Sequence, residues 1–148
     1  MGGSSEGRAF YTAAQMERRA VRMYERALLL FSGGCEGQIR EILAQEKEHL
    51  RRFTEMGGAC EGAEDGALLS AQAADVLFSG GLVEMQRAGA FDSPRALLAF
   101  AAKEEQGAID KYSAFAAQAM GDAARAFSDI ANEEKKHLLS LNAMLDNQ

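Results

Sequence analysis

The phrase Glu46-Lys47-Glu48-His49 returns later in the chain as Glu134-Lys135-Lys136-His137. Together these two phrases contain both histidines of the 148-residue sequence. In each phrase a glutamate stands three residues before a histidine. An α-helix places residues at that spacing on one face, one turn apart. Each phrase therefore predicts a carboxylate and an imidazole that face the same way.

A further glutamate precedes each phrase at a fixed distance. Glu17 lies 29 residues before Glu46, and Glu105 lies 29 residues before Glu134. The two halves of the sequence are therefore offset by 88 residues, from position 17 to position 105. We infer an internal duplication that produces two similar helical hairpins around a pseudo-two-fold axis. The same offset relates further pairs: Ala13 and Ala101, Ala20 and Ala108, Tyr24 and Tyr112, Ile42 and Ile130, Lys47 and Lys135, Leu50 and Leu138, Met56 and Met144.

The composition predicts an all-α fold. The chain has one proline and is rich in residues that favour helices, and no stretch alternates for long with a period of two. We expect helical hairpins over residues 9–56 and 93–145, joined by a crossover over residues 57–92 that runs along the side of a four-helix bundle. Within the crossover, residues 68–78 are expected to be helical. Residues 1–8 are rich in glycine and serine and are expected to be disordered.

The glutamates of the repeat lie inside the apolar stripes of their helices. Burying four carboxylates together is costly, because each loses its hydration and they repel one another. Two divalent cations remove this cost, and the resulting set of oxygen and nitrogen donors suits iron or manganese, with zinc as a further candidate. One glutamate from each of two helices and Glu-x-x-His from each of the other two is the arrangement of two-metal carboxylate bundles. We therefore predict these metal ligands: Glu17, Glu46, His49, Glu105, Glu134 and His137.

Several neighbours of the predicted ligands need a separate interpretation. Tyr24 and Tyr112 each follow a ligand glutamate by seven residues, two helical turns. They are either ordinary core residues or hydrogen-bond donors that orient the ligand carboxylates, and their symmetry favours the second interpretation. In contrast, Glu48, Glu104 and Glu133 are expected to face outward as solvated charges.

The bulk properties exclude some classes of function. The net charge of −6 argues against a nucleic-acid partner, and no apolar run approaches the length of a membrane span. The start of the chain does not have the pattern of a secretory signal, so we expect a cytoplasmic protein. Cys35 and Cys60 are the only cysteines and are expected to be free thiols, because two isolated cysteines cannot form a four-cysteine metal site.

The repeated set of residues resembles the rubrerythrin family of the ferritin-like superfamily. Members show Glu, then Tyr seven residues later, then a helix with Glu-x-x-His, and repeat the set after a crossover. The likeness extends over residues 9–145. It implies a ferritin-like bundle with a di-iron centre that reduces hydrogen peroxide to water, with the six ligands in their matching positions. It gives Tyr24 and Tyr112 a role beside the centre, and it implies a homodimer in which hairpins can be exchanged between chains.

Two departures from the family pattern shape the functional hypotheses. The chain has no four-cysteine rubredoxin module, so a separate donor such as a rubredoxin must supply electrons. The position where many members carry an extra glutamate is Ala108. Besides a peroxidase, the sequence leaves two alternatives. One is a ferroxidase or iron-handling protein that reacts faster with oxygen, and the other is a non-enzymatic bundle stabilised by its metals.

Overall fold

The computed structural model describes residues 2–31, 33–58 and 81–148, and within these ranges it contains helices and no strand. The prediction of an all-α chain is therefore confirmed. The helices are α1 (Gly2–Leu30), α2 (Glu36–Gly58), the short α5 (Leu82–Arg87), α6 (Pro94–Gln118) and α7 (Gly121–Asp146). None of the helices in the described part of the chain is both long and apolar enough to cross a membrane.

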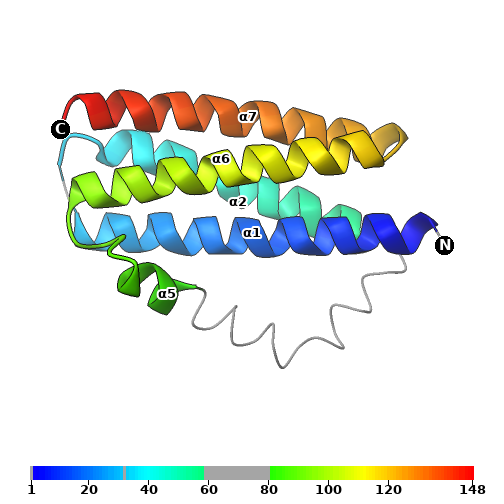
Figure 1. Cartoon of the computed structure of the whole chain (residues 1–148), viewed down its shortest axis with the longest axis horizontal. Coiled ribbons are helices and arrows are strands. Elements are labelled where there is room, and N and C mark those ends of the chain that lie inside the picture. Colours follow the sequence, from blue (N-terminus) through cyan, green and yellow to red (C-terminus); the bar gives the residue numbers. More distant parts are fainter. Residues whose placement is uncertain (1, 32, 59–80) are drawn as a thin grey trace.

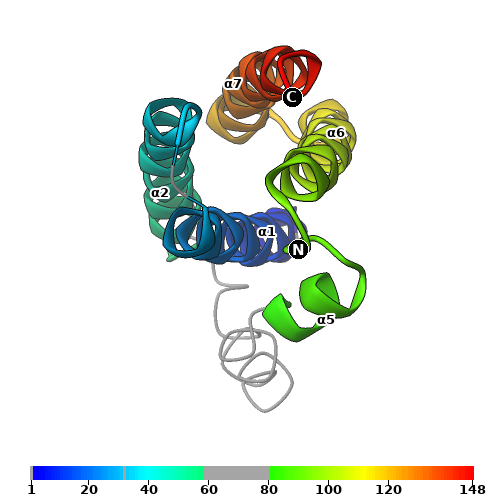
Figure 2. The same cartoon turned by 90° about the vertical axis from the view of Figure 1, so that its left-hand side faces the viewer.

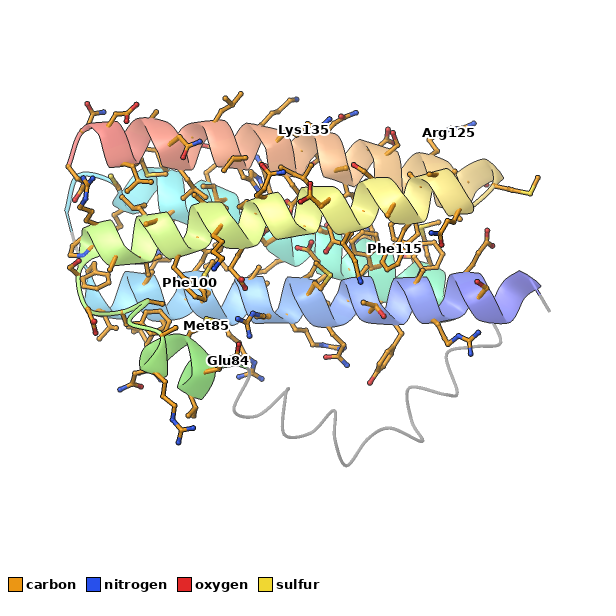
Figure 3. The ribbon with its side chains drawn as sticks, in the orientation of Figure 1. Glu84, Met85, Phe100, Phe115, Arg125 and Lys135 are labelled. Carbon is orange, nitrogen blue, oxygen red and sulfur yellow. The ribbon has the colours of Figure 1, made fainter. Side chains whose placement is uncertain are left out.

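The four long helices lie side by side around a common core (Figures 1 and 2). The chain reverses between α1 and α2 and again between α6 and α7, so each pair forms an antiparallel hairpin, as predicted. Seen from the end, α1 is flanked by α2 and α6, and α7 closes the ring between α2 and α6 (Figure 2). The side chains of Arg125 and Lys135 lie on the outer side of α7 (Figure 3).

Most helix boundaries lie close to the ends of the predicted hairpins. Helix α6 begins after Ser93, whose side chain accepts a hydrogen bond from the backbone N–H of Ala96 at 3.0 Å, and Pro94 occupies the first helical position. The expected disorder of residues 1–8 is wrong, because α1 begins at Gly2. Gly7 and Phe10 are buried, and the Phe10 ring stacks on Phe127 of α7 at 4.8 Å between centroids. This packing extends the helix into a segment whose composition disfavours it.

The described part of the crossover is short and packs against α1. The helix expected over residues 68–78, like Cys60, lies outside the described residues. Helix α5 follows Gly81, which has a φ of +71°, and a side chain at that position would clash with the guanidinium of Arg19. Met85 of α5 is fully buried, and Glu84 Oε2 lies 3.6 Å from Arg19 Nη1 on α1 (Figure 3). These contacts place the end of the crossover beside the hairpins.

The core has a different composition towards each end of the molecule. One cluster is mainly aliphatic and is formed with residues such as Met23, Ile42 and Leu141. The other is aromatic, with the rings of Phe53 and Phe127 5.4 Å apart. The buried polar residues of the predicted site belong to neither cluster, except that Tyr24 and Tyr112 each join one of them. The two halves of the chain are therefore more alike in their buried polar residues than in the apolar side chains that pack around them.

Candidate metal centre

All six predicted ligands converge inside the ring of four helices. Helices α1 and α6 each contribute one glutamate, and α2 and α7 each contribute a glutamate and a histidine one turn later. Every one of the six residues is at most 3% exposed, which is unusual for ionisable residues. The six are Glu17, Glu46, His49, Glu105, Glu134 and His137.

The donor atoms form two overlapping groups, each compact enough to hold one metal ion. One group consists of Glu17, Glu46, His49 and Glu134, and the other of Glu46, Glu105, Glu134 and His137; within each group the donor atoms lie within 4.8 Å of one another. Glu46 and Glu134 belong to both groups, so they are placed to bridge two ions. The histidine rings stand 5.8 Å apart between centroids.

Both histidines present Nδ1 to the interior of the centre. The Nδ1 of His49 lies 3.2 Å from Glu134 Oε1, and the Nδ1 of His137 lies 3.1 Å from the same oxygen. The shared Glu46 Oε1 is 3.0 Å from the first nitrogen and 3.6 Å from the second. The two imidazoles therefore approach one pair of carboxylates from neighbouring helices.

Several inward-facing atoms of the centre are buried without a well-aligned hydrogen bond. They include one oxygen from each of the four glutamates and the Nδ1 of His137. Buried polar atoms are nearly always satisfied, and these converge on the same interior points. Carboxylate oxygens and neutral imidazole nitrogens are donors that iron, manganese and zinc accept. The residues present therefore fit two divalent metal ions.

Without metal ions, the pKa values of the glutamates and histidines are shifted from their ordinary values. Burial raises the pKa of Glu17 and Glu46, and repulsion from neighbouring glutamates raises both further. Burial raises the pKa of Glu105 to about 7. Burial alone would lower the pKa of the histidines, but hydrogen bonds to the carboxylates outweigh it and raise the pKa of His49 to about 11 and of His137 to about 9. In the metal-free protein, bound protons thus supply the positive charge at the centre.

Glu134 differs from the other three glutamates. Burial raises its pKa, but hydrogen bonds from His137 and His49 outweigh burial and hold the pKa below the ordinary value. Its Oε1 lies within 3.2 Å of the Nδ1 atoms of both histidines. Of the four glutamates, Glu134 is therefore the one whose ionised form is favoured by its neighbours.

The two tyrosines occupy equivalent positions in the two hairpins. The hydroxyl of Tyr24 on α1 donates to Glu105 Oε1 on α6 at 2.7 Å, and the hydroxyl of Tyr112 on α6 donates to Glu17 Oε2 on α1 at 2.7 Å. Both tyrosines are fully buried, and burial together with the adjacent carboxylates raises their pKa well above the ordinary value. Each therefore stays a neutral donor to one glutamate of the cluster, which is the hydrogen bond that the second interpretation of these tyrosines requires.

The outer nitrogen of each histidine meets a residue that the sequence did not assign to the site. His49 Nε2 lies 3.0 Å from Glu133 Oε1 on α7, and His137 Nε2 lies 2.6 Å from Gln45 Oε1 on α2. The expectation that Glu133 is a solvated charge is therefore wrong. It stands one residue before a ligand, on the flank of α7 that faces α2. The 88-residue offset between Gln45 and Glu133, each four residues before a histidine, was the signal that could have identified them.

The other two neighbouring glutamates lie outside the centre. Glu48 is half exposed and pairs with Arg51 on its own helix, which agrees with the prediction of an outward charge. Glu104 is only 33% exposed and accepts a hydrogen bond from Arg19 Nε at 2.6 Å. The prediction of a solvated Glu104 is therefore wrong, because this residue links α6 to α1.

A cavity of about 300 Å³ connects the centre with the surface between α1 and α6. All four ligand glutamates line it, and neither histidine does. Its lining includes the exposed Gly107 and Lys111 and the buried Ala108, so it extends from the surface to the carboxylates. The histidines and their partners close the opposite side, between α2 and α7.

No family model matches the chain, and comparisons with curated proteins and with solved structures find no significant match.

Proposed function

We propose that the chain is a ferritin-like, rubrerythrin-like four-helix bundle that holds two iron ions and reduces hydrogen peroxide to water. The observation that carries the proposal is the pair of overlapping ligand groups opening onto a cavity. A metal pair that only stabilised the fold would need no such opening. The cavity accommodates a small oxidant and water, and it leads to the carboxylate side of the centre.

The residues of the chain give this reaction a defined layout. Bound at the six ligands, two ferrous ions would each give one electron, so that one hydrogen peroxide and two protons yield two waters and two ferric ions. Tyr24 and Tyr112 hold the terminal carboxylates in place while the shared ones adapt to the change of charge. The aromatic and aliphatic clusters exclude water beyond the centre. Protons reach the cavity from its exposed rim.

A catalytic cycle requires that the ferric pair be reduced again. The chain has only two cysteines and cannot form a rubredoxin-type iron site. We therefore propose that a separate one-electron donor of the rubredoxin class supplies two electrons in each cycle.

A second candidate is a ferroxidase or iron-handling protein. One observation favours it: the small residues Ala20, Gly107 and Ala108 are part of the cavity lining beside the glutamates, and they leave space there for an entering ion. In this case oxygen, not peroxide, is the preferred oxidant, and ferric iron is released.

Anaerobic loading with ferrous iron followed by stopped-flow mixing separates these functions. We expect two iron ions per chain and an oxidation that is much faster with hydrogen peroxide than with oxygen at equal concentration. Faster oxidation by oxygen together with release of ferric iron would replace the peroxidase with the iron-handling function. Binding of two ions without oxidation by either reagent would reduce the metals to a structural role.

A further inference from the structure

The two histidines of the centre are supported by chemically different groups. His49 Nε2 faces a carboxylate, Glu133, at 3.0 Å, whereas His137 Nε2 faces an amide oxygen, that of Gln45, at 2.6 Å. Gln45 and Glu133 are equivalent positions of the two halves, offset by 88 residues like the ligands themselves. The duplicated chain thus has matching ligands but a charged residue behind one histidine and a neutral residue behind the other.

The hydrogen bonds to the other glutamates of the centre are matched between the two ligand groups. Glu46 and Glu134 belong to both groups. Glu105 and Glu17 each accept one tyrosine hydroxyl at 2.7 Å. The exchange of a carboxylate for an amide behind the histidine is therefore the difference in hydrogen-bond partners that distinguishes the two groups.

This difference acts on the metal through the imidazole. When a metal ion takes Nδ1, the proton of the neutral ring stays on Nε2 and donates to the residue behind it. A carboxylate accepts this hydrogen bond more strongly than an amide and makes the imidazole a more basic ligand. The Glu133 carboxylate also places a negative charge near the ligand group that contains His49.

We propose that Glu133 and Gln45 are positioning residues that make the two metal positions unequal, so that the position of Glu17 and His49 binds a divalent ion more tightly than the position of Glu105 and His137. This inference rests on the two-metal centre proposed above, but not on the oxidant that reacts there. Partners behind metal-bound histidines typically change metal affinity about 10- to 100-fold. Because the Glu133 side chain is 38% exposed, water weakens its effect, and we expect about a tenfold difference.

Titration with cobalt(II), followed by visible absorption and by competition with a chelator, tests the proposal. The Glu105→Ala variant isolates the Glu17 position, and the Glu17→Ala variant isolates the Glu105 position. We expect the dissociation constant to be about tenfold lower in the first variant. Adding Glu133→Gln to it should weaken binding about tenfold, and adding Gln45→Glu to the second variant should tighten binding by a similar factor.

Glu48→Gln provides the matched control. It removes the same charge one residue before His49, but from the exposed side of α2, where Glu48 pairs with Arg51. In the Glu105→Ala background we expect it to change the dissociation constant by less than about twofold. If Glu133→Gln weakens binding no more than Glu48→Gln does, the effect is one of general charge and the proposal is overturned.

The unmodified chain supplies a second measurement that does not depend on the single-position variants. Its titration should show two steps, and Gln45→Glu should bring the two constants together by tightening the weaker one. Two equal constants in the unmodified chain, unaffected by Glu133→Gln, would overturn the inequality while leaving the two-metal centre intact. Failure of the unmodified chain to bind cobalt, iron or manganese would instead overturn the centre itself.

Discussion

At the scale of single residues, Glu46 and Glu134 occupy the positions from which a carboxylate reaches both ligand groups. Their environments nevertheless differ, since burial and neighbouring carboxylates raise the pKa of Glu46 well above the ordinary value, whereas hydrogen bonds from the two histidines hold the pKa of Glu134 below it. The two shared carboxylates therefore differ in how readily they release a proton.

Glu46→Ala should reduce the metal content from two ions per chain to one or none, because it removes a donor from both groups. His137→Ala should remove only the ion of its own group. Metal analysis of protein loaded with ferrous iron under anaerobic conditions measures both. Glu48→Ala is the control and should leave two ions bound, since that side chain is exposed. Retention of two ions in Glu46→Ala would contradict the assignment of the ligands.

Tyr24→Phe should keep both ions but slow the oxidation of ferrous iron by peroxide about 10- to 100-fold, because the carboxylate of Glu105 loses the donor that orients it. Tyr112→Phe should have the same effect through Glu17. Stopped-flow kinetics and metal analysis of the same samples give both values. Tyr11→Phe, the change of the third tyrosine, is the matched control. Unchanged rates in both buried variants would leave the tyrosines with a packing role only.

The sequence was sufficient to predict that the six glutamate and histidine side chains converge in the interior, but not which residues lie behind the histidines. A ligand that interrupts an apolar stripe is visible in the period of its own helix. Gln45 and Glu133 instead lie on helix flanks, and whether such a flank faces water or another helix depends on how α2 packs against α7. That packing comes from contacts between distant segments, which the period of one helix does not contain.

At the scale of the elements, α1 and α6 form the open side of the centre. Ala20 and Ala108, equivalent in the two halves, leave the space that becomes the cavity between these helices. In the sequence, Ala108 stood out only as the position where many members of the resembled family carry a glutamate, and the cavity could not be predicted because its size depends on the separation of α1 and α6. The beginning of α1 shows the same limit, since its helix is stabilised by packing of Phe10 against α7.

Ala108→Leu should fill part of this cavity and slow the oxidation of the loaded protein by peroxide about tenfold, which corresponds to about 1.4 kcal/mol of added barrier. Two ions should still bind, because no donor is removed. Ala114→Leu, which adds the same side chain on the exposed face of α6, is the control and should react at the original rate. An unchanged rate in Ala108→Leu would mean that the oxidant reaches the centre by another path.

At the scale of the whole molecule, the centre links the stability of the fold to pH and to metal. Glu105 has an ordinary pKa of 4.5 and a pKa of about 7 in the folded chain. Its contribution to the stability of the folded chain is therefore present below pH 4.5 and is lost as the pH rises through about 7. His137 contributes fully below its ordinary pKa of 6.5 and loses this contribution as the pH rises through about 9. The same sign holds for His49, with loss through about 11. Metal ions bound at the centre would take the place of these protons.

The melting temperature of the metal-free protein should therefore fall between about pH 6 and about pH 9. The gap between loaded and metal-free protein should widen over the same interval by more than about 4 °C. Calorimetry of protein with and without manganese at several pH values measures this gap, and Glu48→Gln should follow the same curves. A gap that stays constant or narrows over this pH interval would contradict the raised pKa values of Glu105 and His137.

The contacts that orient the ligands all pass from one hairpin to the other. Tyr24 and Tyr112 reach across α1 and α6, and Gln45 and Glu133 reach across α2 and α7. Each hairpin thus carries donors for a metal ion but depends on its counterpart to aim them. Neither half of the chain therefore forms a complete centre by itself. A single hairpin would complete such a centre only by pairing with a second copy of itself, and Gln45 and Glu133 make the two halves of this chain unequal.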